Sequence, residues 1–248
     1  MDGVLWKGTT PLPGLQEFFA TLRVTGRRFV LATNNATRSP DQYVSRFVEY
    51  GIEISDQEIL TSAIATAHLI AQENKSNLRV YPIGEHGLLA ALAAENIEAA
   101  DEDVDAVVVG MDRKLNWDKL SSAALHINAG ARFIGTNPDS SFPTERGVVP
   151  GNGAILAALE VATGVTPRII GKPEPELYNQ ALEMMQARTA DTLVVGDRLD
   201  TDIAGAVRAG LDSLLVLTGI STGHMVEGSS IQPTYVLPGL PEVTAALN

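Results

Sequence analysis

Residues 193–202 read Leu-Val-Val-Gly-Asp-Arg-Leu-Asp-Thr-Asp, an apolar run that leads into three carboxylates. The apolar part predicts a buried strand, and residues 203–210 continue with helical spacing. Open α/β sheets bind their ligands at the carboxyl ends of parallel strands, so this stretch predicts both a fold class and the location of a site. Neighbouring carboxylates repel one another unless a cation lies among them, and Mg²⁺ prefers such oxygen ligands. The alternative is a helix whose first turn carries acids for capping and dipole reasons, Asp202 above all.

The composition limits the classes of protein to which the chain can belong. Its 248 residues are 45% hydrophobic and 19% charged, which is typical of a globular chain with a sizeable core. The absence of cysteine excludes disulfides, zinc–thiolate sites and thiol catalysis, and it favours a reducing cytoplasm. A formal charge of −12 argues against a nucleic-acid partner, because that binding depends on clustered Lys and Arg. No apolar run approaches the roughly 20 residues of a membrane span, so we expect no membrane contact.

Strand and helix patterns alternate along the chain and predict an α/β fold. A long amphipathic helix is expected over residues 55–74, opened by a capping box in which Glu58 reaches back to Ser55. The polar residues 74–77 that follow are interpreted as the hinge of an inserted unit. We therefore expect a doubly wound, mostly parallel Rossmann-like core sheet from residues 1–76 and 167–248, with a smaller α/β cap domain inserted at residues 77–166.

Polar residues follow several of the predicted strands. Thr33-Asn34-Asn35 end one of them and are suited to cradle an anion, although a plain polar turn is the alternative. Lys172 ends another and can face the acidic stretch, although a single lysine is usually a solvated surface charge. Residues 137–143 are expected to form a long recognition loop, and helix 154–163 follows. Gly151 and Gly153 complete neither a phosphate loop nor a dinucleotide fingerprint, so a nucleotide-dependent oxidoreductase has no support.

Four of these strand ends, taken in order, resemble the four motifs of the haloacid dehalogenase superfamily of phosphohydrolases. They are Asp2-Gly3-Val4, Thr33-Asn34-Asn35, Gly171-Lys172-Pro173, and Gly196-Asp197 with Asp202. More narrowly, the chain is similar to the branch of nitrophenyl-phosphatase and nucleotide-phosphatase type, which carries a large α/β cap. Residues 107–112, 136–139 and 150–153 also match this branch. Each match is short, and their common order and spacing make the set specific.

The resemblance implies a Mg²⁺-dependent phosphatase that acts on small phosphorylated metabolites through an aspartyl phosphate. Asp2 is then the acid that protonates the leaving oxygen and activates water, and Lys172 offsets the negative charge between nucleophile and phosphate. The residues expected to bind substrate are Thr33, Asn34, Asn35, Asn137, Asp139 and Lys172. The residues expected to bind Mg²⁺ are Asp2, through its carbonyl, Asp197, and Asp202 as an outer partner. Caps of this size often serve as dimer surfaces in the family, so the resemblance is compatible with a homodimer, although the sequence alone does not fix the oligomeric state.

One departure from the family pattern affects the expected activity. The family motif is Asp-x-Asp-Gly, and its first aspartate, the nucleophile, falls one position before Met1. The apolar strand that leads into this motif is missing too. We therefore expect an N-terminally shortened version of a complete phosphatase, with little or no turnover of its own. The alternative that stays open is a non-catalytic phosphate-binding or scaffold protein of the same fold.

Overall fold

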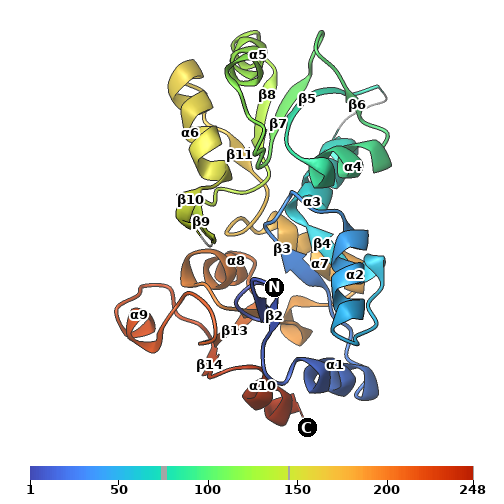
Figure 1. Cartoon of the computed structure of the whole chain (residues 1–248), viewed down its shortest axis with the longest axis vertical. Helices are drawn as coiled ribbons and strands as arrows, with labels where there is room; N and C mark the ends of the chain where they lie inside the picture. Colours follow the sequence, from blue (N-terminus) through green and yellow to red (C-terminus); the bar gives the residue numbers. More distant parts are fainter. Residues whose placement is uncertain (74–76, 145, 248) are drawn as a thin grey trace. The chain divides into compact units, whose positions relative to one another are not determined.

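The structure, a computed structural model, describes residues 1–73, 77–144 and 146–247 of an α/β protein. The chain divides into two compact units (Figure 1). Unit 1 comprises residues 1–32, 43–59 and 172–248, and unit 2 comprises residues 33–42 and 60–171. Residues 33–42 and 60–73, which the sequence assigned to a core domain, fall in unit 2 by this division. The core and cap boundaries themselves stay a prediction, and the expected hinge at 74–77 lies outside the described residues except for Asn77.

Unit 2 is built on a five-stranded parallel sheet. Its strands are, in spatial order, β11 (Arg168–Ile169), β8 (Arg132–Gly135), β7 (Ala106–Val109), β5 (Arg79–Ile83) and β6 (Glu98–Ala99). The central strand β7 is buried along its whole length and is an unbroken apolar run, as expected of a parallel strand covered on both faces. Its neighbour β5 places Tyr81 beside Val107 and Ile83 beside Val109, so these four side chains share one face.

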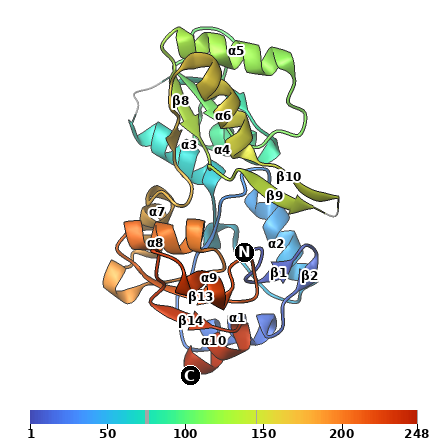
Figure 2. The same cartoon turned by 90° about the vertical axis from the view of Figure 1, so that its left-hand side faces the viewer.

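Two pairs of helices cover the faces of this sheet (Figures 1 and 2). The face with Tyr81 and Val107 packs on α5 (Trp117–Asn128) and α6 (Asn152–Thr163) in one apolar cluster. The helices α3 (Ser62–Glu73) and α4 (His86–Ala94) lie on the other side of the sheet. The loop expected at 137–143 is shorter than predicted, because β9 (Ser141–Thr144) pairs with β10 (Gly147–Pro150) and sets Phe142 opposite Val149.

Unit 1 contains a second parallel sheet, formed by β12 (Leu193–Gly196), β13 (Asp212–Val216) and β14 (Tyr235–Leu237). A short antiparallel pair, β1 (Trp6–Lys7) and β2 (Thr10–Pro11), follows the first residues of the chain. The helices of this unit are α1 (Leu15–Val24), α2 (Pro40–Glu49) from residue 43 onward, α7 (Glu176–Met185), α8 (Ala204–Arg208), α9 (Gly223–Glu227) and α10 (Leu240–Leu247). Two parallel sheets covered by helices place the chain in the α/β class.

The aromatic core of unit 1 fixes the segment that follows Asp2 and Gly3. Trp6 packs edge-on against Phe47 of α2 (Pro40–Glu49) with ring centroids 5.3 Å apart, and Phe19 of α1 meets the same ring at 5.4 Å. Edge-to-face contacts of this kind add to the gain from apolar burial. The first residues of the chain are therefore held by the core of unit 1, although residues 2 to 5 lie outside the strands.

The helix predicted over residues 55–74 is wrong in its first part. Residues 56–58 form a 3₁₀ turn, β4 (Ile59–Thr61) follows, and α3 begins only at Ser62. The predicted capping box is present on this short turn, with Ser55 N–H donating to Glu58 Oε2 at 2.9 Å. The cause is tertiary, because β4 pairs with β3 (Leu31–Thr33), and this pairing overrides the local helical signal. No described helix is long and apolar enough to cross a membrane.

Candidate active site

An almost fully buried ion pair lies at the carboxyl end of β12. Asp202 Oδ1 lies 2.7 Å from Lys172 Nζ, and the two side chains are 10% and 9% exposed. Asp202 Oδ2 accepts the backbone N–H groups of Asp197 and Arg198, each at 3.1 Å. The helical segment predicted after the strand begins earlier, with a π-helical turn at Leu199–Ile203, and this turn places Asp202 beside the end of β12. Both oxygens of Asp202 are thus engaged inside the protein, which agrees with an outer rather than a direct metal contact.

Asp197 is buried against the backbones of two glycines. A Cβ atom on Gly3 or on Gly219 would lie 2.3 or 2.0 Å from Asp197 Oδ2, so only glycine fits at either position. The same oxygen accepts the N–H of Ile220 at 3.0 Å. Gly3 follows the predicted acid Asp2, whose side chain is exposed. The turn at residues 2–3, the end of β12 and the loop after β13 therefore meet around the Asp197 carboxylate.

The buried charges of this group shift one another's pKa values. Burial raises the pKa of Asp197, and the adjacent Asp202 charge raises it further. For Asp202, burial also acts to raise the pKa, but Lys172, the Met1 amino group and the hydrogen bonds together outweigh it and lower the pKa. The buried Met1 amino group itself has a lowered pKa, chiefly because of burial, although Asp202, Asp197 and Asp2 act in the opposite direction. Asp2, Lys172, Asp197 and Asp202 thus belong to one electrostatic group.

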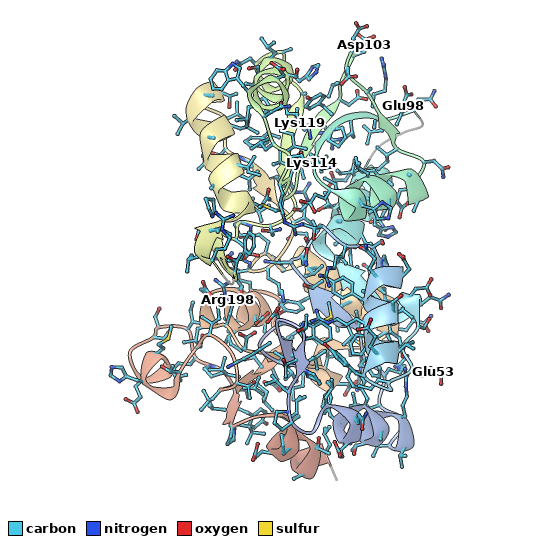
Figure 3. The ribbon with its side chains drawn as sticks, in the orientation of Figure 1. Glu53, Glu98, Asp103, Lys114, Lys119 and Arg198 are labelled. Atoms are coloured by element: carbon cyan, nitrogen blue, oxygen red, sulfur yellow. The ribbon has the colours of Figure 1, made fainter. Side chains whose placement is uncertain are left out.

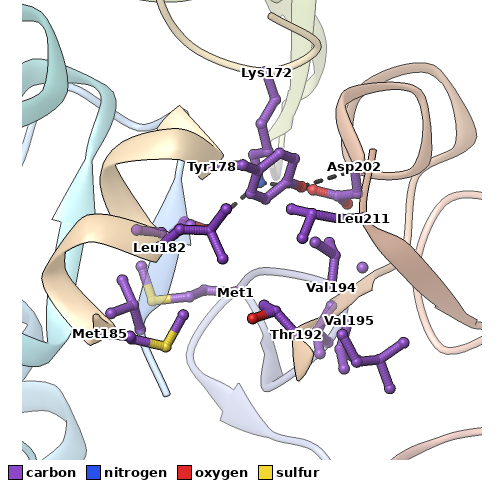
Figure 4. A pocket seen from close by; sticks show the side chains of 16 residues that line it. Met1, Lys172, Tyr178, Leu182, Met185, Thr192, Val194, Val195, Asp202 and Leu211 are labelled. Atoms are coloured by element: carbon purple, nitrogen blue, oxygen red, sulfur yellow. Dashed lines mark hydrogen bonds and ion pairs between the residues drawn. The ribbon is translucent and has the colours of Figure 1, made fainter. Parts of the chain in front are cut away.

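A cavity of about 100 Å³ flanks this group (Figure 4). Its walls are mostly apolar side chains of β12 and α7, such as Val194 and Leu182, and Lys172 and Asp202 line it with charged side chains. Tyr178 Oη donates to the Asp202 carbonyl at 3.2 Å, and burial raises its pKa well above the usual range, so Tyr178 stays a hydrogen-bond donor. The apolar walls are unsuited to a phosphate, which indicates that the polar chemistry lies at the strand end rather than in this cavity.

Lys172 also reaches the end of β3. Its Nζ atom lies 3.5 Å from the carbonyl oxygen of Ala32, the residue that precedes Thr33 in the chain. A lysine in this position is a fixed, buried cation and not the solvated surface charge that was its alternative interpretation. The prediction that Lys172 faces the acidic stretch is confirmed by its contact with Asp202.

In unit 2, the residues after β3 form a hydrogen-bonded loop. Thr33 Oγ1 accepts the N–H of Asn35 at 3.2 Å, and Asn35 Oδ1 accepts both the N–H and the hydroxyl of Thr37 at 2.9 and 2.8 Å. The buried Asn34 donates from Nδ2 to Asp139 Oδ1 at 3.4 Å. The side-chain oxygen of Asn35 therefore shapes the loop, and the predicted substrate residues Asn34 and Asp139 are brought together.

A second set of buried amides supports this loop. Asn137 Nδ2 donates to the Asn34 carbonyl at 2.8 Å, and Asn137 Oδ1 accepts the N–H of Asp139 at 3.2 Å. Asn152, at the start of α6, donates to the Asn137 carbonyl at 2.8 Å, and Ser62 Oγ donates to the Asn34 carbonyl at 2.6 Å. Sequence reasoning missed Ser62 and Asn152. The available signal was that each is a small polar residue at the start of a helix otherwise rich in apolar residues.

Another charged pair lies in unit 2 and was not predicted. Asp112 follows β7, is almost fully buried, and meets Lys119 of α5 at 2.5 Å. Figure 3 labels Lys119, in the first turns of α5, and Lys114, on the segment that leads into this helix. Asp112 Oδ1 also accepts the backbone N–H of Lys114 at 2.8 Å. Its contacts are made within the turn and the helix, so we interpret Asp112 as a residue that stabilises the start of α5.

The structure thus divides the predicted site residues between the two units. Unit 1 brings together Asp2, Lys172, Asp197 and Asp202, and unit 2 brings together Thr33, Asn34, Asn35, Asn137 and Asp139. Among residues 1–73, 77–144 and 146–247, no group of three or more His, Asp or Glu side chains is arranged to hold a metal ion. Mg²⁺ needs no such group, since it is usually held by one or two carboxylates together with water and substrate phosphate.

Comparison with known proteins identifies the class to which this fold and these strand ends belong. Residues 1–98 match the family model of haloacid dehalogenase-like hydrolases, and residues 169–243 match a second model described as HAD-hydrolase-like. The chain belongs to the haloacid dehalogenase-like hydrolase family.

Relatives within this family are phosphatases by name. The chain is 41% identical to an acid sugar phosphatase of Staphylococcus saprophyticus over 248 residues, covering all of this chain and 95% of the relative. A 4-nitrophenylphosphatase of Thermotoga maritima is 33% identical, with a TM-score of 0.95 over 100% of this chain and 95% of that one. A glycerol phosphate phosphatase of Mycobacterium tuberculosis, in complex with magnesium, is 38% identical, with a TM-score of 0.92 over 98% and 74%. The predicted resemblance to phosphatases of nitrophenyl-phosphatase type is confirmed.

Proposed function

We propose that this chain carries the acid–base, phosphate-binding and metal-binding groups of a Mg²⁺-dependent phosphomonoesterase for small phosphorylated metabolites. The observation that carries the proposal is the buried group of Lys172, Asp197 and Asp202 at the end of β12. A buried cation beside paired carboxylates at a parallel strand end is the arrangement that phosphoryl transfer needs, because the reaction is stabilised mainly by positioning and charge. The names of the relatives support phosphate esters as the substrate class.

The residues around Asp197 fit a magnesium ion. Its carboxylate is a hard oxygen ligand whose pKa is raised by burial and by Asp202, so a divalent cation would relieve an unfavourable charge. Asp202 is committed to Lys172 and two backbone N–H groups, and we assign it the outer position. We propose that Asp197 and the carbonyl of Asp2 hold the ion. When bound, the ion neutralises charge on the transferring phosphoryl group.

The other residues are proposed to act on the substrate directly. Asp2, exposed and next to the Gly3 turn, is the general acid that protonates the leaving oxygen and the general base that then activates water. Thr33 donates its hydroxyl proton to a phosphoryl oxygen, since the Thr33 oxygen already accepts the Asn35 N–H. The Lys172 ammonium offsets negative charge at the phosphoryl group.

We assign the role of phosphoryl acceptor to the first aspartate of the family motif. The Asp-x-Asp-Gly pattern of the family gives this role to an aspartate two positions before Asp2. Attack by its carboxylate on phosphorus breaks the ester bond and forms an aspartyl phosphate, which water then hydrolyses to inorganic phosphate. The cytoplasmic location, the absence of nucleic-acid and membrane partners, and the homodimer expected from the sequence remain predictions.

Phosphate release from p-nitrophenyl phosphate tests the proposal. We would compare residues 1–248 with the same residues preceded by an apolar strand that ends in aspartate, and with a matched polypeptide that ends in alanine. Mg²⁺-dependent release is expected only from the polypeptide with the aspartate. Release by residues 1–248 alone would contradict the assigned nucleophile. Binding of inorganic phosphate without release by any of the three would favour the rival function, a non-catalytic phosphate-binding protein.

A further inference from the structure

We propose that Asn137 is a positioning residue that orients the peptide group between Asn34 and Asn35, and that it does not contact the substrate. The inference rests on the proposed function in one respect, since it takes Thr33 to donate to a phosphoryl oxygen. It differs from the sequence interpretation, in which Asn137 itself binds substrate. The asparagine is 4% exposed and its side-chain amide is engaged on both sides.

Asn137 acts on the loop through the Asn34 carbonyl. It accepts two hydrogen bonds, from Ser62 Oγ at 2.6 Å and from Asn137 Nδ2 at 2.8 Å. A carbonyl oxygen has two lone pairs, so both are used. Two buried donors from different parts of the chain, one on α3 and one after β8, therefore fix the direction of this carbonyl.

Fixing the carbonyl also fixes the N–H of the next residue. The peptide bond is planar and trans, so the C=O of Asn34 and the N–H of Asn35 point in opposite directions. With the carbonyl directed at Ser62 and Asn137, the Asn35 N–H is directed to Thr33 Oγ1, where it donates at 3.2 Å. Because the Thr33 oxygen accepts this N–H through one lone pair, its hydroxyl proton stays available for donation to an anion.

Asn137 is itself held by rigid neighbours. Asn152 donates from Nδ2 to the Asn137 carbonyl at 2.8 Å and to the Val109 carbonyl at 3.2 Å, which ties residue 137 to the central strand β7. Gly171 leaves room for this arrangement, because a Cβ atom there would lie 2.7 Å from Asn34 Oδ1 and 3.2 Å from Asn137 Cβ. Hydrogen bonds thus connect β7 and α6 through Asn137 to the peptide group beside Thr33.

Two variants of Asn137 separate its donor group from its acceptor oxygen. Asn137→Asp keeps an oxygen that can accept the Asp139 N–H and loses the Nδ2 donor to the Asn34 carbonyl and to Thr136 Oγ1, whereas Asn137→Ala loses all three hydrogen bonds. Asn116→Asp is the matched control, because Asn116 caps α5 by accepting the Lys119 N–H and aspartate caps equally well. The measurements are the dissociation constant of inorganic phosphate by titration calorimetry and the hydrogen-exchange rate of the Asn35 amide by NMR, both on residues 1–248.

Both Asn137 variants are expected to weaken phosphate binding about tenfold, because Thr33 is then less well placed to donate to the phosphate. A hydrogen bond to a charged group contributes that much or more to binding. Both are also expected to speed exchange at the Asn35 amide by about tenfold, because the peptide group is released. The control is expected to change neither value. An effect of Asn137→Ala without one of Asn137→Asp would overturn the inference, as would no effect of either. Weaker phosphate binding with unchanged Asn35 exchange would also overturn it, because Asn137 would then contact the anion directly.

A second variant keeps the test decisive if Asn137→Asp does not fold. Ser62→Ala removes the other donor to the Asn34 carbonyl at the first residue of α3, where alanine is a good helix former. It is expected to change both measurements in the same direction, and no change would count against the inference. If the unaltered protein binds no phosphate, the proposed function fails, and the Asn35 exchange rates still decide whether Asn137 orients the loop.

Discussion

Lys172 and Asp202 form an ion pair of 2.7 Å in which neither side chain is more than one-tenth exposed. The lysine comes from the segment before α7 and the aspartate from the turn after β12, so the pair joins two segments 30 residues apart in sequence. Asp202 Oδ2 also accepts the two N–H groups that close this turn, those of Asp197 and Arg198. The contacts that hold the Lys172 cation in place therefore also stabilise unit 1.

The first prediction concerns the free energy of unfolding. Asp202→Asn leaves the Lys172 charge buried without its counterion, and removing one partner of a buried pair costs about 3–5 kcal/mol. Asp200→Asn is the matched control, because its bond to Arg198 lies at a side chain that is 65% exposed and such pairs are worth about 0–1 kcal/mol. Urea unfolding at pH 7 measures both. Equal losses would show that the ion pair does not stabilise the fold.

The second prediction concerns how the free energy of unfolding changes at low pH. The pKa of Asp202 is lower in the folded than in the unfolded chain, so its ionised form favours folding. This contribution is fully present above the unfolded-chain pKa of about 3.9, and it is lost as the pH falls through the folded-state pKa. Urea unfolding between pH 7 and pH 3 is therefore expected to show a difference between the unaltered protein and Asp202→Asn that shrinks as the pH falls. A difference independent of pH would refute the assignment.

The third prediction concerns Asp197, whose pKa is shifted in the opposite direction. A carboxyl with a raised folded-state pKa opposes folding when it is ionised, so its removal relieves burial and repulsion from Asp202. Asp197→Asn keeps an oxygen for the Ile220 N–H and is expected to leave stability unchanged or raise it by about 1 kcal/mol, while Mg²⁺ binding is lost. Calorimetric Mg²⁺ titration and urea unfolding measure the two effects. Asp191→Asn, at an exposed pair with Arg188, is the control that should retain Mg²⁺ binding.

The fourth prediction concerns substrate selection. Phe142 on β9 is the partly buried aromatic side chain of the loop expected to discriminate between substrates, and it lies opposite Val149 in the hairpin. Phe142→Ala is expected to change the relative rates across a panel of sugar phosphates, glycerol phosphate and nucleotides, measured with the polypeptide that carries the nucleophile. Val148→Ala, at an exposed position of the same hairpin, should leave the ratios unchanged. A uniform change in all rates with Phe142→Ala would argue against selection by this loop.

The candidate site residues could be selected from the sequence because they directly follow apolar runs that predict strands. An apolar run such as residues 106–109 has one stable location, a covered parallel strand, and the polar residue after it then falls at the carboxyl edge. The close approach of Gly219 to Asp197 could not be predicted in the same way. Its closeness to Asp197 depends on β13 being the neighbour of β12, and strand order is a tertiary property.

The errors have the same origin. Residues 59–61 are apolar at spacings that suit a helix as well as a strand, and only their pairing with β3 decides between them. Asn137 was expected from the sequence to bind substrate, and this expectation stays a prediction. The structure shows that its side chain is buried, and a sequence does not say whether an amide is directed outward or into the protein. That depends on acceptors such as the Asn34 carbonyl, which lies 103 residues away.

The two units have separate apolar interiors, one around Trp6 and Phe47 and the other around Val107 and Leu159. Substitutions that accumulate in one interior need no compensating change in the other. The apolar residues of unit 2 can thus be exchanged independently of those of unit 1, which makes the two interiors separate targets for stabilising substitutions.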